Sequence, residues 1–327
     1  MSQKIVTPHI LRRVIQCLFL FFCLFIGYRL FQHFIWATGQ SSVFVPKPPS
    51  VEAFLPISAL MAAKQFILTN KWDIVHPAGL TLFFAFIWMA LLFRKSFCGY
   101  ICPVGLISNL TEQLGRKLKL QKELPVKAAR ILSVPKYIIL GGFVYFIVIN
   151  MSTRQISSFL TLPYNYVADS KMLAFFLAPS VTTLIVIAVL TIISLFIRNF
   201  WCRFLCPYGA LLGIFSTFSP TAITRDADTC ISCGKCTKIC PAAINIDERK
   251  AVHSPECVGC AECVGACPVN DCLTVRTFNK KVPFATIAIG CLTILLTFYG
   301  IAVLTGHWYS DATPELIRKF HMMIFNK

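Results

Sequence analysis

Eight cysteines between residues 230 and 267 form two copies of one pattern, and a proline follows each copy. The first copy is Cys230, Cys233, Cys236 and Cys240, and the second is Cys257, Cys260, Cys263 and Cys267. Both read C-x2-C-x2-C-x3-C-P, a spacing that binds [4Fe–4S] clusters through thiolates in bacterial proteins. Zinc knuckles would instead need two C-x2-C pairs for each ion. The pattern therefore predicts two iron–sulfur clusters and one-electron chemistry.

The last cysteine of each copy is expected to bind the cluster of the other copy. One cluster would be held by Cys230, Cys233, Cys236 and Cys267, and the other by Cys257, Cys260, Cys263 and Cys240. We assign residues 221–277 to an α+β ferredoxin domain of the bacterial 2[4Fe–4S] type.

A second cysteine motif, C-x3-C-P, occurs twice, in FCGYICPVG and WCRFLCPYG; its cysteines are Cys98, Cys102, Cys202 and Cys206. In a regular helix, residues four apart share one face, so each pair could chelate a metal ion. Two facing copies would bring four thiols together. Three interpretations remain open: a redox-active or metal-binding site, including an additional cluster; a structural turn with buried thiols; and transient disulfide chemistry.

The other four cysteines have no partner spacing. Cys17, Cys23 and Cys291 lie in apolar segments and are interpreted as small buried packing residues, and Cys272 as a structural residue.

The composition predicts a membrane protein. Of 327 residues, 56% are hydrophobic and only 14% are charged, which is too apolar for an ordinary soluble domain. Five segments are long and apolar enough for transmembrane helices, near 13–37, 74–93, 131–151, 172–197 and 283–305. No small-residue cleavage site follows the first, so we expect an uncleaved span and not a signal peptide. Residues 50–69 predict an amphipathic helix on the outer face.

The distribution of basic residues predicts the orientation. The N-terminus and the segments 94–136 and 198–281 hold 22 Lys and Arg, against 8 on the other side. Positive residues stay cytoplasmic, which predicts a cytoplasmic N-terminus and ferredoxin domain and a periplasmic C-terminus, in the inner membrane of a bacterium. The net charge of +17 then reflects topology and attraction to membrane lipid, and not nucleic-acid binding.

Several ionisable residues are expected at membrane depth, where such groups are functional candidates. They are Arg29, His33, Asp73, His76 and His307. Together they could line a quinol pocket near the outer face, where a histidine or carboxylate would accept protons. The alternatives are anchoring at the membrane interface and, from paired histidines, a haem site.

The spans, the duplicated C-x3-C-P and the double ferredoxin motif together resemble the NapH type of membrane ferredoxin, and the wider set with MauN and the membrane part of NosR-like polyferredoxins. The resemblance covers about residues 10–277. It implies a four-span core, cytoplasmic clusters, and electrons passed from quinol to a partner redox protein. A fifth span and residues 306–327 depart from this pattern.

We therefore expect an α-helical integral membrane protein with about five spans and a duplicated two-helix repeat, into which the ferredoxin domain is inserted. Residues 1–220 would form the membrane domain, and residues 278–327 the fifth span and a short tail. The first functional hypothesis is a quinol dehydrogenase subunit that relays electrons through two clusters. The alternatives are a copper reductase or metalloenzyme maturation factor using the C-x3-C-P thiols, and an anchor with structural clusters.

Overall fold

The computed structural model describes residues 7–122 and 124–325. The chain divides into two compact units. Unit 1 comprises Met1–Phe21, Phe86–Leu140 and Val186–Ile294, and unit 2 comprises Phe22–Ala85, Gly141–Ile185 and Leu295–Lys327. Residues 1–6, which belong to the terminus expected on the cytoplasmic side, lie outside the described residues.

Three helical segments among the described residues are long and apolar enough to cross a membrane. They are α1 (Pro8–Ala37), the segment Lys127–Asn150, and α14 (Ala285–Leu304). The second is built from α5 (Val126–Leu132), α6 (Val134–Phe143) and η3 (Val144–Asn150). Its division near Pro135 follows from the missing proline N–H.

A fourth span depends on a bent pair of helices. The axes of α9 (Ala168–Leu177) and α10 (Val181–Phe196) differ by 79°, and the two pass the same test only together. Helix α3 (Pro77–Phe93) has 17 residues, short of the roughly 20 that cross a bilayer. The structure thus supports three or four of the five expected spans.

Unit 2 contains the segment expected to be an amphipathic helix. It forms η1 (Pro49–Phe54) and then α2 (Pro56–Thr69), because Pro56 fits the first turn of a new helix. Helix α2 packs against α7 (Thr153–Leu160), which begins with a capping box between Ser152 and Gln155. Helices α8 (Pro163–Tyr166) and α15 (Pro314–Phe325) complete the unit.

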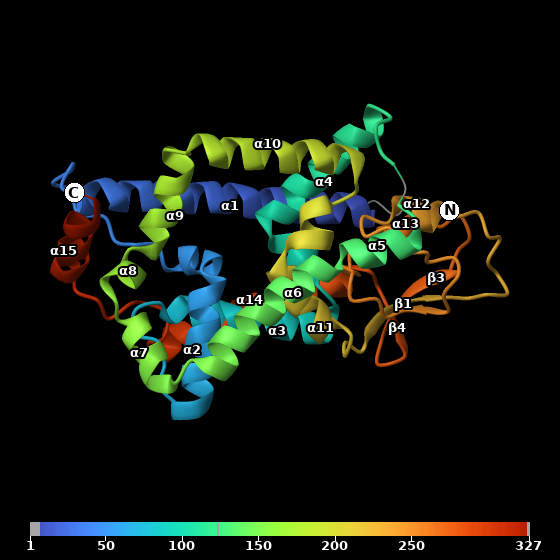
Figure 1. Cartoon of the computed structure of the whole chain (residues 1–327). Coiled ribbons are helices and arrows are strands. Elements are labelled where there is room, and N and C mark those ends of the chain that lie inside the picture. Colours follow the sequence, from blue (N-terminus) through green and yellow to red (C-terminus); the bar gives the residue numbers. More distant parts are fainter. Residues whose placement is uncertain (1–6, 123, 326–327) are drawn as a thin grey trace. The chain divides into compact units, whose positions relative to one another are not determined.

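Unit 1 contains a four-stranded antiparallel sheet in the order β2-β1-β3-β4. The strands are β1 (Thr221–Arg225), β2 (Ala251–Val252), β3 (Leu273–Thr277) and β4 (Lys280–Val282). Ile223 pairs with Val275 on one side and with Val252 on the other, and all three are buried. Two short helices, α12 (Lys235–Ile239) and α13 (Glu262–Ala266), lie side by side next to the sheet (Figure 1).

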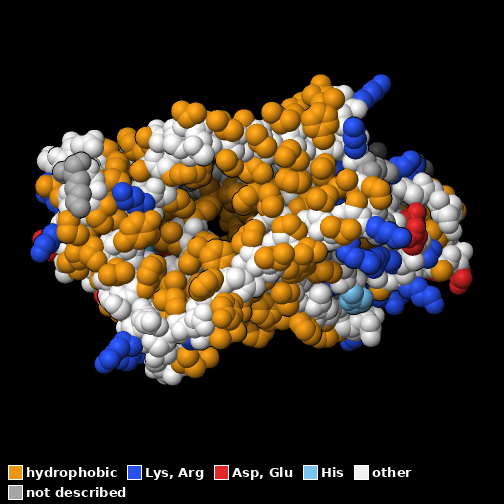
Figure 2. Space-filling model, viewed as in Figure 1, with side chains coloured by type: hydrophobic (Ala, Val, Ile, Leu, Met, Phe, Trp, Pro, Cys, Tyr) orange, Lys and Arg blue, Asp and Glu red, His pale blue; other side chains and the backbone are white. Residues whose placement is uncertain are grey.

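The surface differs between these elements. Figure 2 shows hydrophobic side chains over α1 and α10, whereas charged side chains gather over the strands and their loops. Phe21 of α1 is 67% exposed and Val181 of α10 is 73% exposed. Apolar faces of this extent are typical of helices in contact with lipid. The prediction of buried packing cysteines is wrong for Cys17, which is exposed on the outward face of α1, and for Cys23, which is only half-buried, whereas Cys291 is buried.

Candidate functional site

The eight cysteines of the double motif line two separate cavities in unit 1. Around the first cavity lie Cys230, Cys233, Cys236 and Cys267, together with Cys272. Around the second lie Cys240, Cys257, Cys260 and Cys263. The structure therefore places the four residues of each expected ligand set around one cavity.

Two matching helical turns produce this arrangement. Gly234 precedes α12 and Ala261 precedes α13, and both adopt the left-handed conformation, with φ of +68° and +55°. Cys240 and Cys267 end the two helices in extended conformation. Because the chain turns away at these two residues, each reaches the cavity of the other copy.

The donor chemistry of both cavities suits an iron–sulfur cluster. All the cysteines are free, and within residues 7–122 and 124–325 no three His, Cys, Asp or Glu side chains lie close enough to hold a single ion. A cubane cluster spreads its four thiolates further apart than one zinc ion does. Burial raises the pKa of Cys240 to about 11, so this thiol ionises only beside a cation.

The two cavities differ in exposure. Cys233 of the first cavity is exposed, whereas Cys240, Cys260 and Cys263 of the second are buried. Ile223 and Ile246 add an apolar lining to the second cavity. The second set is therefore the more deeply buried of the two, although Cys236 of the first set is buried as well.

Both C-x3-C-P motifs adopt the same local structure. A single π-helical turn, η2 (Phe97–Ile101) or η4 (Trp201–Leu205), precedes the second cysteine of each motif. The amide of Cys102 donates to the carbonyl of Phe97 at 3.0 Å, and that of Cys206 to Trp201 at 2.9 Å. The expected regular helix is thus wrong, because the wider turn closes bonds over five residues instead of four.

The proline of each motif begins a new helix. Helix α4 (Pro103–Lys117) and helix α11 (Pro207–Ser216) each carry proline in the first turn and the preceding cysteine as N-cap. The Cys206 sulfur accepts a hydrogen bond from the amide of Gly209 at 3.2 Å. A β-carbon at Gly105, the matching glycine, would lie 2.5 Å from the Cys98 carbonyl oxygen.

The four C-x3-C-P thiols share one cavity of about 120 Å³ in unit 1, and Tyr208 and Phe97 also line it. Burial raises the pKa of Cys98 well above its usual value, and that of Cys202 to about 12. Burial therefore favours the neutral form of Cys98 and Cys202, and none of the four cysteines forms a disulfide. The structure brings both copies together, as the facing-repeat hypothesis requires.

The four-thiol cavity shares a wall with the second cluster cavity. Pro241, Ala242 and Val258 line both. On the side of the first repeat, the amide of Lys95 donates to the Cys257 carbonyl at 3.4 Å, and Gly99 packs on Val258. One layer of residues thus separates the two sets of thiols.

The second repeat holds the other ligand loop of the same cavity. The Asn199 side-chain amide donates to the Pro241 carbonyl at 2.8 Å and to the Glu112 carboxylate at 3.0 Å. Since Pro241 directly follows Cys240, each repeat fixes one of the two loops that carry the second set of cysteines.

Buried ion pairs reinforce this contact. Arg12 donates to Glu262 at 2.8 Å and to the Gly99 carbonyl at 3.0 Å. Glu256 accepts from Lys95 at 3.3 Å and from Lys136. Burial opposes the charge of Lys95, but Glu256 outweighs it and raises the pKa of Lys95.

Two of the predicted polar candidates belong to a buried network in unit 2. The Nε2 atom of His76 lies 2.7 Å from the Asn165 carbonyl, and its Nδ1 atom lies 3.2 Å from Lys47 Nζ. His76 donates through Nε2 to the Asn165 carbonyl, and its Nδ1 atom also lies 3.3 Å from the Glu52 carboxylate. His33 donates through Nδ1 to the Val45 carbonyl at 2.7 Å. Both nitrogens of His76 are engaged, so it offers none to a haem iron.

Sequence reasoning missed the charged centre of this network. Lys47 lies 2.7 Å from Glu52 and 3.5 Å from Asp169, and both carboxylates are buried. Buried charges need such partners. A lone Glu52 within the apolar segment 50–69 was the available signal.

The remaining polar candidates lie elsewhere in unit 2. Asp73 and His307 line a cavity of about 440 Å³. Burial raises the pKa of Asp73, which favours a carboxyl group able to carry a proton. Arg29 contacts Gln32 on its own helix at 3.1 Å, and no contact joins it to the network among the described residues.

Comparison with known proteins supports the duplication and the double motif. A family model described as "4Fe-4S binding domain" matches residues 75–121 and again 179–224, so each match contains one C-x3-C-P copy. A second, described as "4Fe-4S dicluster domain", matches residues 223–275.

Whole-chain relatives are also found. "Putative electron transport protein YccM" of Escherichia coli (strain K12) is 41% identical over 297 residues, covering 87% of this chain and 82% of the relative. "Ferredoxin-type protein NapH" of Haemophilus influenzae is 26% identical over 54% of this chain and 56% of its own length. "Methylamine utilization ferredoxin-type protein MauN" of Methylobacillus flagellatus is 22% identical over 62% and 65%, respectively. No solved structure matches the chain.

Proposed function

Because the chain belongs to the NapH/MauN-type membrane ferredoxins, the family that includes YccM, we propose that it transfers electrons between the quinone pool and a redox partner. Its 4Fe-4S domains support an electron-transfer role. The proposal adds two points to this role: quinol is the electron donor, and a separate redox protein is the partner.

In this proposal, the two cavities of unit 1 bind two [4Fe–4S] clusters, which supply one-electron storage when bound. Cys230, Cys233, Cys236 and Cys267 would hold the first, and Cys240, Cys257, Cys260 and Cys263 the second. The exposed Cys233 suits the first site for contact with a soluble partner.

One observation carries the proposal further. The wall of Pro241, Ala242 and Val258 is common to the second cluster cavity and the four-thiol cavity. Two sulfur sites that share lining residues are neighbours, as a relay of single electrons requires. We propose that Cys98, Cys102, Cys202 and Cys206 form a redox or metal site next to the second cluster.

Unit 2 would supply proton chemistry for quinol oxidation. Asp73, whose pKa is raised by burial, is the group best suited to take up a proton, and the buried His33 and His76 lie in the same unit. In the proposed topology, the N-terminus and the ferredoxin domain, residues 221–277, are on the cytoplasmic side of a bacterial inner membrane and the C-terminus is periplasmic, which the distribution of Lys and Arg supports.

The test uses the full-length protein, purified and reconstituted anaerobically in nanodiscs. A menaquinol analogue is added and cluster reduction is followed by EPR. Reduced-cluster signals support the proposal. If dithionite reduces the clusters but no quinol does, then quinol is not the electron donor. The electron-transfer role itself would still stand.

A second experiment tests the copper hypothesis, which is favoured by a cavity shared by four thiols that form no disulfide. Cys98→Ser and Cys202→Ser would then abolish stoichiometric Cu(I) binding, while Cys291→Ser, a buried cysteine outside the cavity, would not. Clusters inert to every donor would indicate a structural role.

A further inference from the structure

A basic cavity of about 590 Å³ lies in unit 1, outside both cysteine cavities. Its lining comes from the region of α5, from residues 197–204, and from the loops that follow α12 and β2. Five cationic side chains line it: Lys122, Arg130, Arg198, Arg203 and Arg249. Among the described residues, two carboxylates, Glu248 and Glu256, and one histidine, His253, are the other titratable side chains of its wall besides Tyr137.

Two of these cations, Arg130 and Arg249, are uncompensated among the described residues. Among the described residues, Arg130 and Arg249 make no side-chain hydrogen bond or ion pair that would neutralise them. Arg203 donates to the Arg198 carbonyl at 3.4 Å, which is a neutral acceptor. Glu256 is already paired with Lys95 and Lys136, so it does not neutralise the arginines. A concave site lined by one sign of charge attracts the opposite sign.

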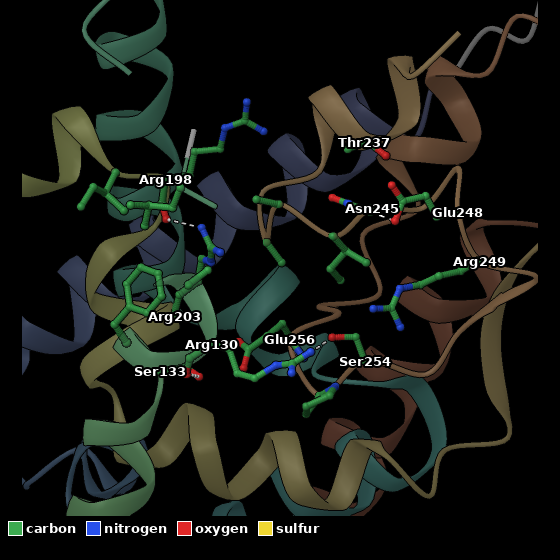
Figure 3. A pocket seen from close by; sticks show the side chains of 18 of the residues that line it. Arg130, Ser133, Arg198, Arg203, Thr237, Asn245, Glu248, Arg249, Ser254 and Glu256 are labelled. Atoms are coloured by element: carbon green, nitrogen blue, oxygen red, sulfur yellow. Dashed lines mark hydrogen bonds between the residues drawn. The ribbon is translucent and has the colours of Figure 1, made fainter. Parts of the chain in front are cut away.

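The arginines come from different segments and surround one space. Figure 3 shows Arg203 and Arg249 on opposite sides of the cavity, with Arg130 between them along its lower edge. Guanidinium groups match phosphate geometry through two parallel hydrogen bonds. The phosphate would thus be held by side chains, which agrees with the lack of a glycine-rich phosphate loop in the sequence.

One part of the cavity wall is apolar and comes from the ferredoxin domain. Ala242, Ala243 and Ile244 line the cavity, and Ala242 and Ile244 also line the cavity of Cys240, Cys257, Cys260 and Cys263. The size lies in the usual range of small-molecule sites, about 300–1,000 Å³. A ligand in this cavity would therefore be one residue layer from the second cluster site.

We propose that this cavity binds a phosphate-bearing small molecule, with its phosphate on Arg130, Arg203 and Arg249 and its apolar part on Ala242–Ile244. The same chemistry is offered by a soluble nucleotide and by the headgroup of an anionic lipid. The binding site follows from the geometry alone; only its effect on the second cluster rests on the proposed function.

Binding is measured on full-length protein in nanodiscs of neutral lipid. The probes are flavin mononucleotide and AMP, with riboflavin and adenosine as matched ligands that lack the phosphate. We expect at least one phosphorylated probe to bind, and its unphosphorylated partner to bind at least tenfold more weakly. Arg130→Gln and Arg249→Gln should each weaken binding about tenfold or more.

Two control variants each remove one positive charge close in sequence to a cavity arginine: Lys127 is three residues from Arg130, and Lys250 follows Arg249. Lys127→Gln and Lys250→Gln change exposed cations that do not line the cavity, and both should leave the affinity unchanged. Equal losses in Arg130→Gln and Lys127→Gln would overturn the site, since they would indicate a general surface effect.

A second arm identifies the source of the phosphate. Native mass spectrometry of protein from nanodiscs containing cardiolipin would show a retained lipid that is lost in Arg130→Gln and Arg249→Gln if a headgroup occupies the cavity. Absence of binding for both nucleotides and for cardiolipin would refute the inference.

A third readout separates this inference from the proposed function. Ligand binding to cluster-loaded protein should change the EPR signal of the second cluster and not that of the first. Binding without any cluster signal leaves the site in place and removes the electron-transfer proposal, whereas cluster reduction without binding does the opposite.

Discussion

Gly99, in the first C-x3-C-P turn, lies directly against Val258, in the loop between two cysteines of the second cluster cavity. A β-carbon at residue 99 would be 2.5 Å from the Val258 carbonyl oxygen. Any side chain at residue 99 would therefore clash with this carbonyl oxygen. Glycine allows the turn that contains Cys98 to contact the loop between Cys257 and Cys260.

Gly99→Ala should destabilise this contact, because backbone lies on both sides and cannot give way as a side chain can. We expect a loss of about 1–3 kcal/mol of folding stability, as for an overpacked core, and reduced iron content after reconstitution. Thermal unfolding and iron analysis measure both. Gly300→Ala is the control, since nothing lies within 4 Å of a β-carbon there; equal behaviour of the two variants would contradict the close contact.

Crossed ligation predicts a specific pairing of cysteine variants. Cys240→Ser and Cys260→Ser should remove the same EPR signal, because both residues line the second cavity. Cys236→Ser and Cys267→Ser should remove the other signal, because both line the first. If Cys240→Ser matched Cys236→Ser instead, each motif would bind its own cluster and the proposed ligand sets would be wrong.

Lys47 should be essential to the stability of unit 2. Lys47→Met leaves Glu52 and Asp169 buried without their cation, and breaking a buried ion pair in this way costs about 3–5 kcal/mol. The double variant Lys47→Met/Glu52→Gln removes one of the two stranded charges and should recover part of the loss. Thermal unfolding in nanodiscs measures both, and a double variant less stable than Lys47→Met would contradict the assigned coupling.

The ion pair of Lys47 and Glu52 should also contribute a stabilisation that is lost in acid. Burial opposes the charge of Glu52, but Lys47 and His76 outweigh it and lower the pKa of Glu52 below its usual 4.5. A carboxyl group whose pKa is lower in the folded state stabilises the protein at any pH above its pKa in the unfolded state. This stabilisation is lost as the pH falls through the pKa of the folded state. The stability difference between wild type and Glu52→Gln should therefore be constant at neutral pH and shrink below about pH 4.5. A difference that grew on acidification would contradict the direction of the shift.

Local sequence rules predicted the elements that depend only on neighbouring residues. Residues 50–69 are helical, as predicted, and Pro103 and Pro207 begin helices, as proline geometry favours. These outcomes follow from proline geometry and apolar patterning, which act within one or two turns of chain. The π-helical turns before Cys102 and Cys206 were not predicted, because they form under packing from distant loops.

Long-range relationships were beyond sequence reasoning for a physical reason. Lys47 and Asp169 are far apart in the chain, and nothing in either local segment indicates that they meet; the pair exists because unit 2 folds both into one buried space. The arginines around the basic cavity, which come from three separate segments, are a second example.

The sequence by itself determined the kinds of donor and their spacing: two iron–sulfur motifs, a duplicated C-x3-C-P, and long apolar segments. Ligand type and spacing follow from covalent geometry, which the chain carries in any conformation. Only the tertiary structure decided that the four-thiol cavity and the second cluster cavity share Pro241, Ala242 and Val258. That adjacency depends on close packing between segments more than a hundred residues apart, which no local pattern encodes.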